Sequence, residues 1–326
     1  MVKRKILALT IVIMTVLSFS SCTRNDLKKA SISGFYFDTL ITLEFFGEFS
    51  DEAADSCLKL AAYYDGLLNK SVESSDIYKI NHSNGQTVSV SQETAELLTY
   101  CIDFAKESGG SFDPMIGALS SLWDFKSETP DIPSKTDIDN ALGHIDIDLI
   151  SINKDKVTIN DPYALVDIGA VAKGFIADRL KERAESLGIE SGIINLGGNV
   201  LVIGSKPDSS PFKVGIKEPF SDSSEPITFV EVNDLSVVTS GCYERYFEYN
   251  GDIYHHILDT KTGYPVKNNL LSVSVIGPSS AVCDALSTVL YIKGIDEGLE
   301  FIDGYEDYEC IFIKDDKSVI YSYSFD

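Results

Sequence analysis

Residues 193–202 read Ile-Ile-Asn-Leu-Gly-Gly-Asn-Val-Leu-Val, and this short stretch decides the fold. Two runs of aliphatic and β-branched residues flank Gly197-Gly198, which is the pattern of two strands joined by a tight glycine turn. Strands joined by so short a turn pair in antiparallel fashion. The centre of the chain is therefore predicted to hold an antiparallel pair.

Outward from this pair, the chain carries further strands and amphipathic helices. Apolar residues recur with a helical period over 51–68, 91–106, 166–187 and 280–293, and Gly188 and Gly294 stand where the last two helices are predicted to stop. Further strands are predicted at 35–46, 212–216, 228–232, 236–239, 243–249 and 271–276, with a closing hairpin over 308–324. Antiparallel strands with segregated helices predict the α+β class: mostly antiparallel sheets with packed helices in a single large domain, residues 32–326.

The N-terminal residues have the layout of a bacterial export signal. Lys3-Arg4-Lys5 precede an apolar run over 6–17, and small residues lead up to Cys22. We predict that residues 1–21 are removed, that the Cys22 thiol is lipidated, and that residues 22–31 tether the fold to the extracytoplasmic face of the cell membrane. The alternative, an uncleaved membrane helix, is disfavoured because the apolar run is shorter than the roughly 20 residues that span a bilayer.

The chain is strongly acidic, with a formal net charge of -23 that becomes about -26 once the three basic residues of the signal are removed. Such a surface repels nucleic acid and anionic lipid, so no nucleic-acid partner is expected. A negatively charged substrate would need a metal ion or a local positive site. The five cysteines after Cys22 show no paired C-x-x-C spacing, so neither a disulfide framework nor a zinc site is indicated.

Residues 167–174, Asp-Ile-Gly-Ala-Val-Ala-Lys-Gly, lead into a predicted helix. Small residues let a ligand approach the backbone, the free N–H groups of a helix start favour anions, and Lys173 adds a positive charge. The segment is therefore a candidate phosphate site. It fits neither a P-loop nor a dinucleotide fingerprint, and an ordinary glycine-softened helix start explains it equally well.

Asp284 and Thr288 lie four residues apart on a predicted helix, so the carboxylate and the hydroxyl project from the same face. Oxygen ligands of this kind hold hard cations, and magnesium is the usual ion where phosphates share the coordination. The alternative is that Asp284 only caps the start of the helix after Ser279-Ser280, and spacing alone favours that cap.

Residues 254–265 place His255 and His256 beside Asp259 and a tight turn. A histidine near a carboxylate can act as a general base. Adjacent residues of a strand point to opposite faces, so at most one of the two histidines faces a given site. Packing alone would also explain histidines in such a position.

Taken together, these segments closely resemble the ApbE family of FAD:protein FMN transferases in order and spacing. The resemblance covers nearly the whole chain after the signal and rests on residues 37–39, 67–69, 74–81, 108–114, 122–123, 167–174, 195–199, 239–241, 256–259, 262–265 and 284–288. Two departures are visible. Phe37-Asp38 stands where Met-Gly is commoner, and Thr260 replaces the usual proline after Asp259.

The resemblance implies a set of site residues. Magnesium would be held by Asp284, Thr288 and the backbone carbonyl of Ala170. Contacts to FAD would come from Asp167 and Lys173, with Phe37, Phe112, Asp113 and His255 near the flavin or adenosine part. His256 would be the base.

The resemblance also implies the reaction, a magnesium-dependent transfer of FMN from FAD to a threonine or serine of an acceptor protein with release of AMP. The acceptor would be an extracytoplasmic FMN-binding protein or a subunit of a membrane electron-transfer complex. Two alternatives remain open at this point. One is an FAD pyrophosphatase that gives FMN and AMP, and the other is a flavin-binding lipoprotein without chemistry, against which the presence of both Asp284 and Thr288 counts.

Overall fold

A computed structural model describes residues 28–125, 127, 129–221 and 225–322. The predicted signal peptide and Cys22 lie outside the described residues. No helix in the described part of the chain is both long and apolar enough to cross a membrane.

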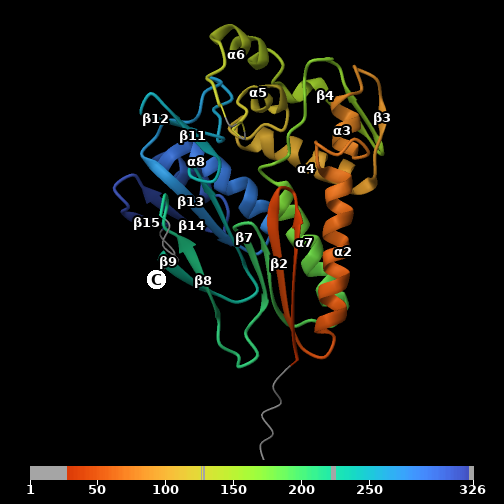
Figure 1. The fold of residues 1–326 in the computed structure, drawn as a ribbon, viewed down its shortest axis with the longest axis vertical. Coiled ribbons are helices and arrows are strands. Elements are labelled where there is room, and N and C mark those ends of the chain that lie inside the picture. Colours follow the sequence, from red (N-terminus) through yellow and green to blue (C-terminus); the bar gives the residue numbers. More distant parts are fainter. Residues whose placement is uncertain (1–27, 126, 128, 222–224, 323–326) are drawn as a thin grey trace, which may run out of the picture.

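The centre of the molecule is a sheet of eight strands in the order β1-β2-β6-β7-β10-β13-β14-β15 (Figure 1), in which every neighbouring pair is antiparallel. The strands are β1 (Lys29–Tyr36), β2 (Thr39–Phe46), β6 (Ser191–Leu196), β7 (Asn199–Gly204), β10 (Ser236–Gly241), β13 (Leu270–Gly277), β14 (Glu309–Lys314) and β15 (Val319–Tyr321). The predicted hairpin at 193–202 is confirmed as β6 and β7. Its turn needs glycine, because Gly197 and Gly198 have φ of 64° and 96°.

The N-terminal edge of the sheet differs from the prediction, because 35–46 is not one strand but the turn and second arm of the β1–β2 hairpin. The turn residues Phe37 and Asp38 both have positive φ, 53° and 59°, which is uncommon outside glycine and asparagine. The Asp65 carboxylate holds the turn by accepting a hydrogen bond from the Phe37 N–H at 2.9 Å. The predicted tether also ended too late, since Lys29 already belongs to β1.

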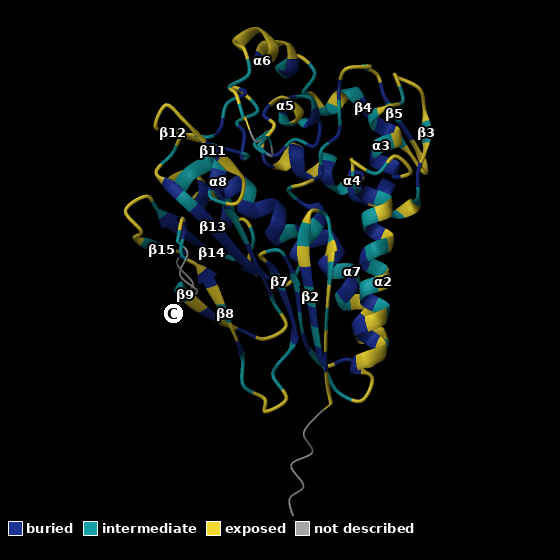
Figure 2. Cartoon of the chain, in the orientation of Figure 1, coloured by how far each residue is buried: buried dark blue, intermediate teal, exposed yellow. Residues whose placement is uncertain are grey.

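Three helices cover one face of this sheet: α2 (Ser50–Leu68), α7 (Ala172–Ser186) and α8 (Ser280–Ile302). Their buried residues form the main hydrophobic core with the sheet (Figure 2). The helix predicted at 51–68 is confirmed. The helix predicted at 166–187 starts only at Ala172, and α8 does not stop at Gly294 but continues through a kink there, where φ is 77°.

The opposite face of the sheet is partly covered by a separate hairpin, β8 (Phe212–Lys217) and β9 (Pro226–Val232). Residues of this hairpin and of the central sheet share a second, smaller core, which includes Ile216, Val230, Val202 and Val237. The molecule thus has three layers at this level, with helices on one side of the central sheet and the β8–β9 hairpin on the other.

A further layer lies above the end of the central sheet in Figure 1. It contains α3 (Asp76–Asn81), α4 (Gln92–Glu107), α5 (Gly117–Leu122), α6 (Lys135–Leu142), a 3-10 turn at Ile147–Leu149, the small sheet β3 (Val88–Ser89), β4 (Ile150–Asn153) and β5 (Lys156–Ile159), and the hairpin β11 (Tyr246–Tyr249) and β12 (Asp252–His255). The predicted helix at 91–106 is confirmed as α4, whereas the strand predicted at 243–249 is shorter than expected. Trp123 ties this layer together by donating a hydrogen bond to the Gly263 carbonyl at 2.9 Å.

Candidate active site

A cavity of about 480 Å³ lies where this upper layer meets the central sheet and the first turn of α7. Segments far apart in the sequence meet in its wall, including the turn before α7, the middle of α8, and the loop after β12. Its lining includes Lys70, Phe112, Asp113, Asp167, Ala170, Lys173, Glu244, Arg245, His256, Asp284 and Thr288. Most of the site residues predicted from the sequence are therefore brought to one place.

Asp284 is a buried carboxylate and does not cap its helix. The cap of α8 is Ser279, whose side chain accepts a hydrogen bond from the Val282 N–H. Asp284 is only 4% exposed and accepts a hydrogen bond from the Gly174 N–H at 2.8 Å. Burial raises the pKa of Asp284 above its usual range, and the nearby Lys173 ammonium opposes that rise. The cap alternative is therefore wrong.

Close packing of α7 on α8 brings the two halves of the site together. A Cβ on Gly174 would lie 2.2 Å from the backbone oxygen of Ser280, so only glycine permits this approach. Thr288 lies one turn beyond Asp284, and its hydroxyl is 3.2 Å from that of Ser240 on β10. The carboxylate and the hydroxyl thus face the cavity from one side of α8.

Asp167 holds an ion pair at the other side of the cavity. The Lys70 ammonium lies 2.6 Å from one of its oxygens, and Ser120 Oγ donates to the same oxygen at 2.7 Å. The Gly169 N–H donates to the second oxygen at 2.9 Å. Burial alone would raise the pKa of Asp167, but Lys70 and these hydrogen bonds outweigh it, and the pKa lies below its usual value. Asp167 is therefore ionised.

The start of α7 has the features of an anion site. The cap residue Val171 offers no side-chain acceptor, although the Ala172 N–H already donates to the Ile168 carbonyl and the Gly174 N–H to the Asp284 carboxylate. Lys173 is in this first turn and lines the cavity together with Arg245, whereas the Lys70 ammonium is paired with Asp167. Several carboxylates line the same cavity, so the positive charge that a phosphate-bearing ligand would meet is that of Lys173 and Arg245.

Phe112 and Asp113 form another wall of the cavity. Phe112 is buried, packs edge-on against Phe104 with ring centres 5.4 Å apart, and its N–H donates to Ser108 Oγ. Burial raises the pKa of Asp113 to about 6, although a hydrogen bond from the Met115 N–H opposes the rise. Asp113 can therefore gain a proton in mildly acidic conditions.

The two histidines point in different directions. His256 lines the cavity, and its Nδ1 lies 3.3 Å from the Arg245 carbonyl oxygen. Burial lowers the pKa of His256 to about 3, with further lowering by Arg245 and Lys173. His255 is buried, its Nε2 faces the Val266 carbonyl at 3.0 Å, and it lines neither described cavity. The predicted contact of His255 with the flavin or adenosine is therefore not supported.

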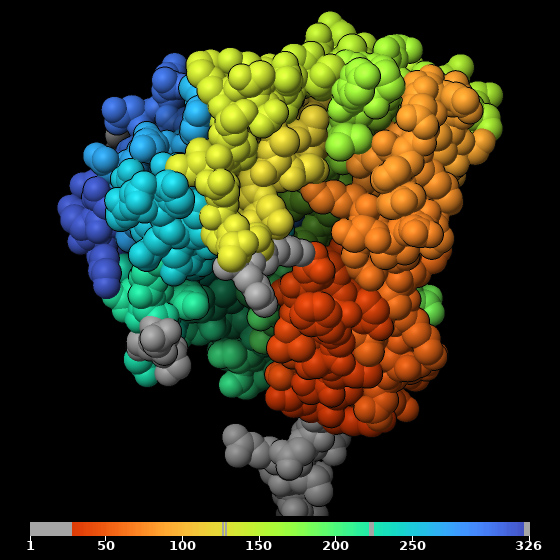
Figure 3. Space-filling model, turned by 45° about the horizontal axis from the view of Figure 1, so that its top comes forward, coloured from red at the N-terminus to blue at the C-terminus, as the bar shows by residue number. Residues whose placement is uncertain are grey.

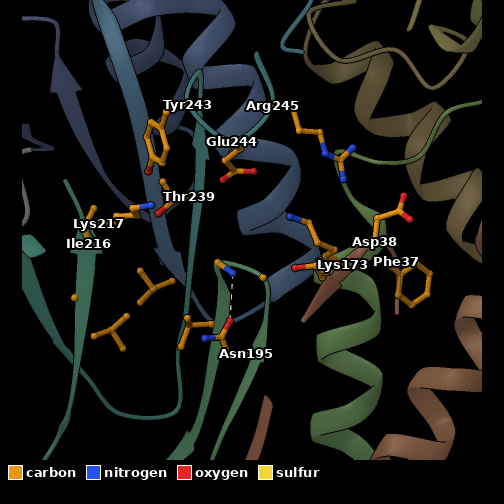
Figure 4. Close-up of a pocket in the computed structure, with 17 residues that line it drawn as sticks. Phe37, Asp38, Lys173, Asn195, Ile216, Lys217, Thr239, Tyr243, Glu244 and Arg245 are labelled. Carbon is orange, nitrogen blue, oxygen red and sulfur yellow. Dashed lines mark hydrogen bonds between the residues drawn. The ribbon is translucent and has the colours of Figure 1, made fainter. Parts of the chain in front are cut away.

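A second cavity, of about 520 Å³, adjoins the first (Figure 4). The two share Asp38, Lys173, Thr239, Glu244 and Arg245. Phe37 lines this second cavity and not the first. Sequence reasoning missed Lys70, Glu244 and Arg245. The only signal for them was their place in the chain, since Lys70 directly follows the matched segment 67–69 and Glu244 and Arg245 come shortly after the matched segment 239–241.

The fold and the site together define a class of protein. A buried carboxylate and a hydroxyl one helical turn apart, beside the start of α7 with its Lys173, form a site for an enzyme that acts on phosphate groups. Residues 37–312 match the ApbE family. The chain belongs to this family.

Similar proteins agree with this assignment. The chain is 34% identical over 276 residues to an FAD:protein FMN transferase of Klebsiella pneumoniae, covering 83% of this chain and 85% of the relative. It is 30% identical over 284 residues to one of Treponema pallidum, covering 82% and 78%. Among solved structures, the ApbE protein of Thermotoga maritima superposes with a TM-score of 0.84 at 28% identity, covering 91% of this chain and 98% of that one.

Proposed function

We propose that this protein is a magnesium-dependent FAD:protein FMN transferase, which moves FMN from FAD to a threonine or serine hydroxyl of an acceptor protein and releases AMP. The observation that carries the proposal is the pairing of Asp284 and Thr288 with the cationic start of α7 in one cavity. The family assignment and the names of the relatives support the same reaction.

The residues present fit a magnesium ion. The Asp284 carboxylate, the Thr288 hydroxyl and the Ala170 carbonyl are oxygen donors of the kind that magnesium prefers. Asp284 forms no ion pair within the described residues, so this buried charge lacks the partner that buried carboxylates usually have. The described residues hold no cluster of three acidic, histidine or cysteine side chains, so the set that we propose is a mixed one. Magnesium would neutralise charge on the pyrophosphate.

The protein's own groups would do the rest. The Lys173 ammonium at the start of α7 would bind the phosphates of FAD, and Phe112 would offer an apolar wall to one of its ring systems. Asp167, kept ionised by Lys70, would orient the loop that leads into α7 through its bond to Gly169. These groups would bind and orient FAD.

His256 would accept the proton of the acceptor hydroxyl. A carbonyl oxygen only accepts hydrogen bonds, so the contact with Arg245 places the ring proton on Nδ1 and leaves Nε2 free to act as a base. With a pKa of about 3 the ring is neutral at physiological pH but weakly basic. The anionic pyrophosphate would offset the positive charges of Arg245 and Lys173, which raises the basicity of the ring when FAD is bound.

In the complete step, the acceptor oxygen forms a bond to the FMN phosphorus, the bond from that phosphorus to the bridging oxygen breaks, and AMP leaves. The hydroxyl proton passes to His256. If water took the place of the acceptor hydroxyl, the same site would act as an FAD pyrophosphatase.

We further propose that lipidated Cys22 anchors the protein outside the cell membrane, where the acceptor is an FMN-binding protein or a subunit of an electron-transfer complex. Strand β1 has eight residues and runs from the tether to the turn at Phe37, a span of about 26 Å. Figure 1 shows this turn at the end of β1 that lies far from the tether, and Asp38 of the turn lines the catalytic cavity, so a lipid on Cys22 would leave that cavity open to partners away from the bilayer. Metabolic labelling with a fatty acid analogue tests this, since Cys22→Ala should abolish labelling and membrane association.

The reaction itself is tested by incubating the chain from Thr23 onward with FAD, magnesium and an FMN-binding acceptor domain. We expect the acceptor to gain the mass of FMN while an equal amount of AMP appears. Release of AMP and free FMN with no adduct, for every acceptor tried, would point to the pyrophosphatase. Binding of FAD with neither product would contradict both enzymatic functions.

A further inference from the structure

The second cavity, of about 520 Å³, adjoins the proposed FAD site, and the residues that line it alone have no role in the proposed reaction. It lies between the central sheet and the β8–β9 hairpin, and Figure 3 shows the molecular surface hollowed between the red β1–β2 turn and the green strands. Its floor includes Val200 and Val237 of the central sheet, and Gly198 forms part of its rim. A Cβ on Gly198 would meet nothing within 4 Å, so this rim is open.

One wall of this cavity is the edge of strand β8. The four consecutive residues 214–217 all line it. Side chains along a strand alternate between the two faces, so consecutive residues can line one cavity only if the edge of the strand faces it. The edge of a strand presents backbone N–H and C=O groups.

That edge of β8 is unpaired within the described residues. Strand β8 pairs only with β9, in a two-stranded sheet, and no backbone hydrogen bond joins residues 214–217 to any other described segment. The four residues span about 13 Å at roughly 3.3 Å per residue. Such an edge is a template for an added strand, because main-chain hydrogen bonds hold an extended peptide of almost any sequence.

The cavity also leads to the reacting groups. The wall it shares with the FAD site carries Lys173, Glu244 and Arg245, and Figure 4 shows these three side chains between β8 and the turn of β1 and β2. Lys173 belongs to the first turn of α7, beside Asp284. A hydroxyl that arrives along β8 therefore meets the FAD cavity at the phosphate end.

We propose that this cavity binds the acceptor protein, with an extended segment of the acceptor adding to β8 as a third strand and presenting its threonine or serine hydroxyl at the shared wall. The inference rests on the proposed transferase function and specifies how its protein substrate is held. The Glu244 carboxylate opens to both cavities and can accept a hydrogen bond from that hydroxyl, which positions it.

A kinetic experiment tests occupancy of the cavity. Val200 lines only this second cavity, so Val200→Tyr should fill its floor without touching the FAD site. Loss of two or more backbone hydrogen bonds at about 1 kcal/mol each should raise KM for the acceptor domain at least about tenfold. KM for FAD should not change. The matched control is Val88→Tyr, at a half-buried valine of edge strand β3 that lines neither cavity and packs away from the β8–β9 hairpin, and it should leave both KM values unchanged.

Hydrogen–deuterium exchange tests strand addition itself, without relying on any variant of the enzyme. The probe is an acceptor domain whose target threonine is replaced by valine, added with FAD and magnesium. Exchange of the amides in 214–217 should slow on binding, whereas the β9 amides should not change.

The outcomes separate the two ideas. One outcome is that wild-type enzyme forms the FMN adduct, Val200→Tyr has an unchanged KM for the acceptor, and the β8 amides stay unprotected. The acceptor then binds elsewhere and strand addition to β8 is wrong, while the transferase function stands. If wild-type enzyme cleaves FAD yet never forms an adduct, the proposed function fails and this inference fails with it.

Discussion

The role of Asp284 can be tested by two substitutions that separate charge from hydrogen bonding. Asp284→Asn keeps an oxygen that can accept the hydrogen bond from the Gly174 N–H, but it removes the negative charge. Asp284→Ala removes both. Because the carboxylate is buried and its pKa is raised by burial, ionisation costs folding free energy, and the asparagine variant should fold at least as well as the wild type.

The alanine variant should be less stable, because it leaves the buried Gly174 N–H without an acceptor. An unsatisfied buried donor costs about 1–3 kcal/mol, which should lower Tm by several degrees while the protein still folds. Activity should not follow stability. Loss of a group beyond the direct metal ligands already costs about 10- to 100-fold, so loss of a ligand should cost at least about 100-fold in both variants.

The assay is magnesium-dependent AMP release from FAD, measured beside thermal unfolding of the same preparations. Raised magnesium should not restore the rate of either variant, because the charge that attracts the ion is gone. Wild-type turnover in Asp284→Asn would refute the assignment of this carboxylate. So would a rate that falls only in proportion to the loss of folded protein in Asp284→Ala.

Three further predictions concern other parts of the site. His256→Asn should lower the transfer rate about 10²- to 10⁴-fold at neutral pH, and a full transfer rate would rule it out as the base. Gly174→Ala should lower the free energy of unfolding by more than about 2 kcal/mol, because its Cβ would collide with α8. The control is Gly66→Ala in α2, where a Cβ meets open space, and it should raise the free energy of unfolding by about 0.5–1 kcal/mol. Equal changes of the two variants in urea unfolding would show that close packing at Gly174 is not the cause. The pKa of Asp113 is about 6 in the folded protein and lower in the unfolded chain, so the folded state binds the proton more tightly. The free energy of unfolding should therefore fall as pH rises from about 4 to about 6. Asp113→Asn should flatten this dependence on pH, and an unaltered slope would contradict the raised pKa of Asp113.

The sequence predicted the central elements well because their signals are local. The glycine pair at 197–198 carries the positive φ that a tight turn requires, and the cap at Ser91 lies where a polar residue precedes an apolar helix. The turn at Phe37 and Asp38 was missed because it lacks the usual glycine or asparagine. It is held instead by Asp65, a residue 28 positions away.

The site was predicted in part for the same reason. The Asp284–Thr288 pair follows from helical spacing, but whether Asp284 caps a helix or faces a cavity depends on Gly174, 110 residues earlier in the chain. The ion pair that keeps Asp167 charged depends on Lys70, 97 positions away. The two histidines are adjacent in sequence, and His255 is held away from the cavity by its packing against Tyr291 and its contact with the Val266 carbonyl. Contacts of such long range leave no local pattern.

The most direct test of the account is to follow, in one reaction, the mass of an FMN-binding acceptor domain and the AMP released from FAD. We predict one FMN bound through a phosphoester to a threonine or serine for each AMP, only with magnesium present and not with Asp284→Asn. AMP release without any adduct, or an adduct that forms equally well with Asp284→Asn, would contradict it.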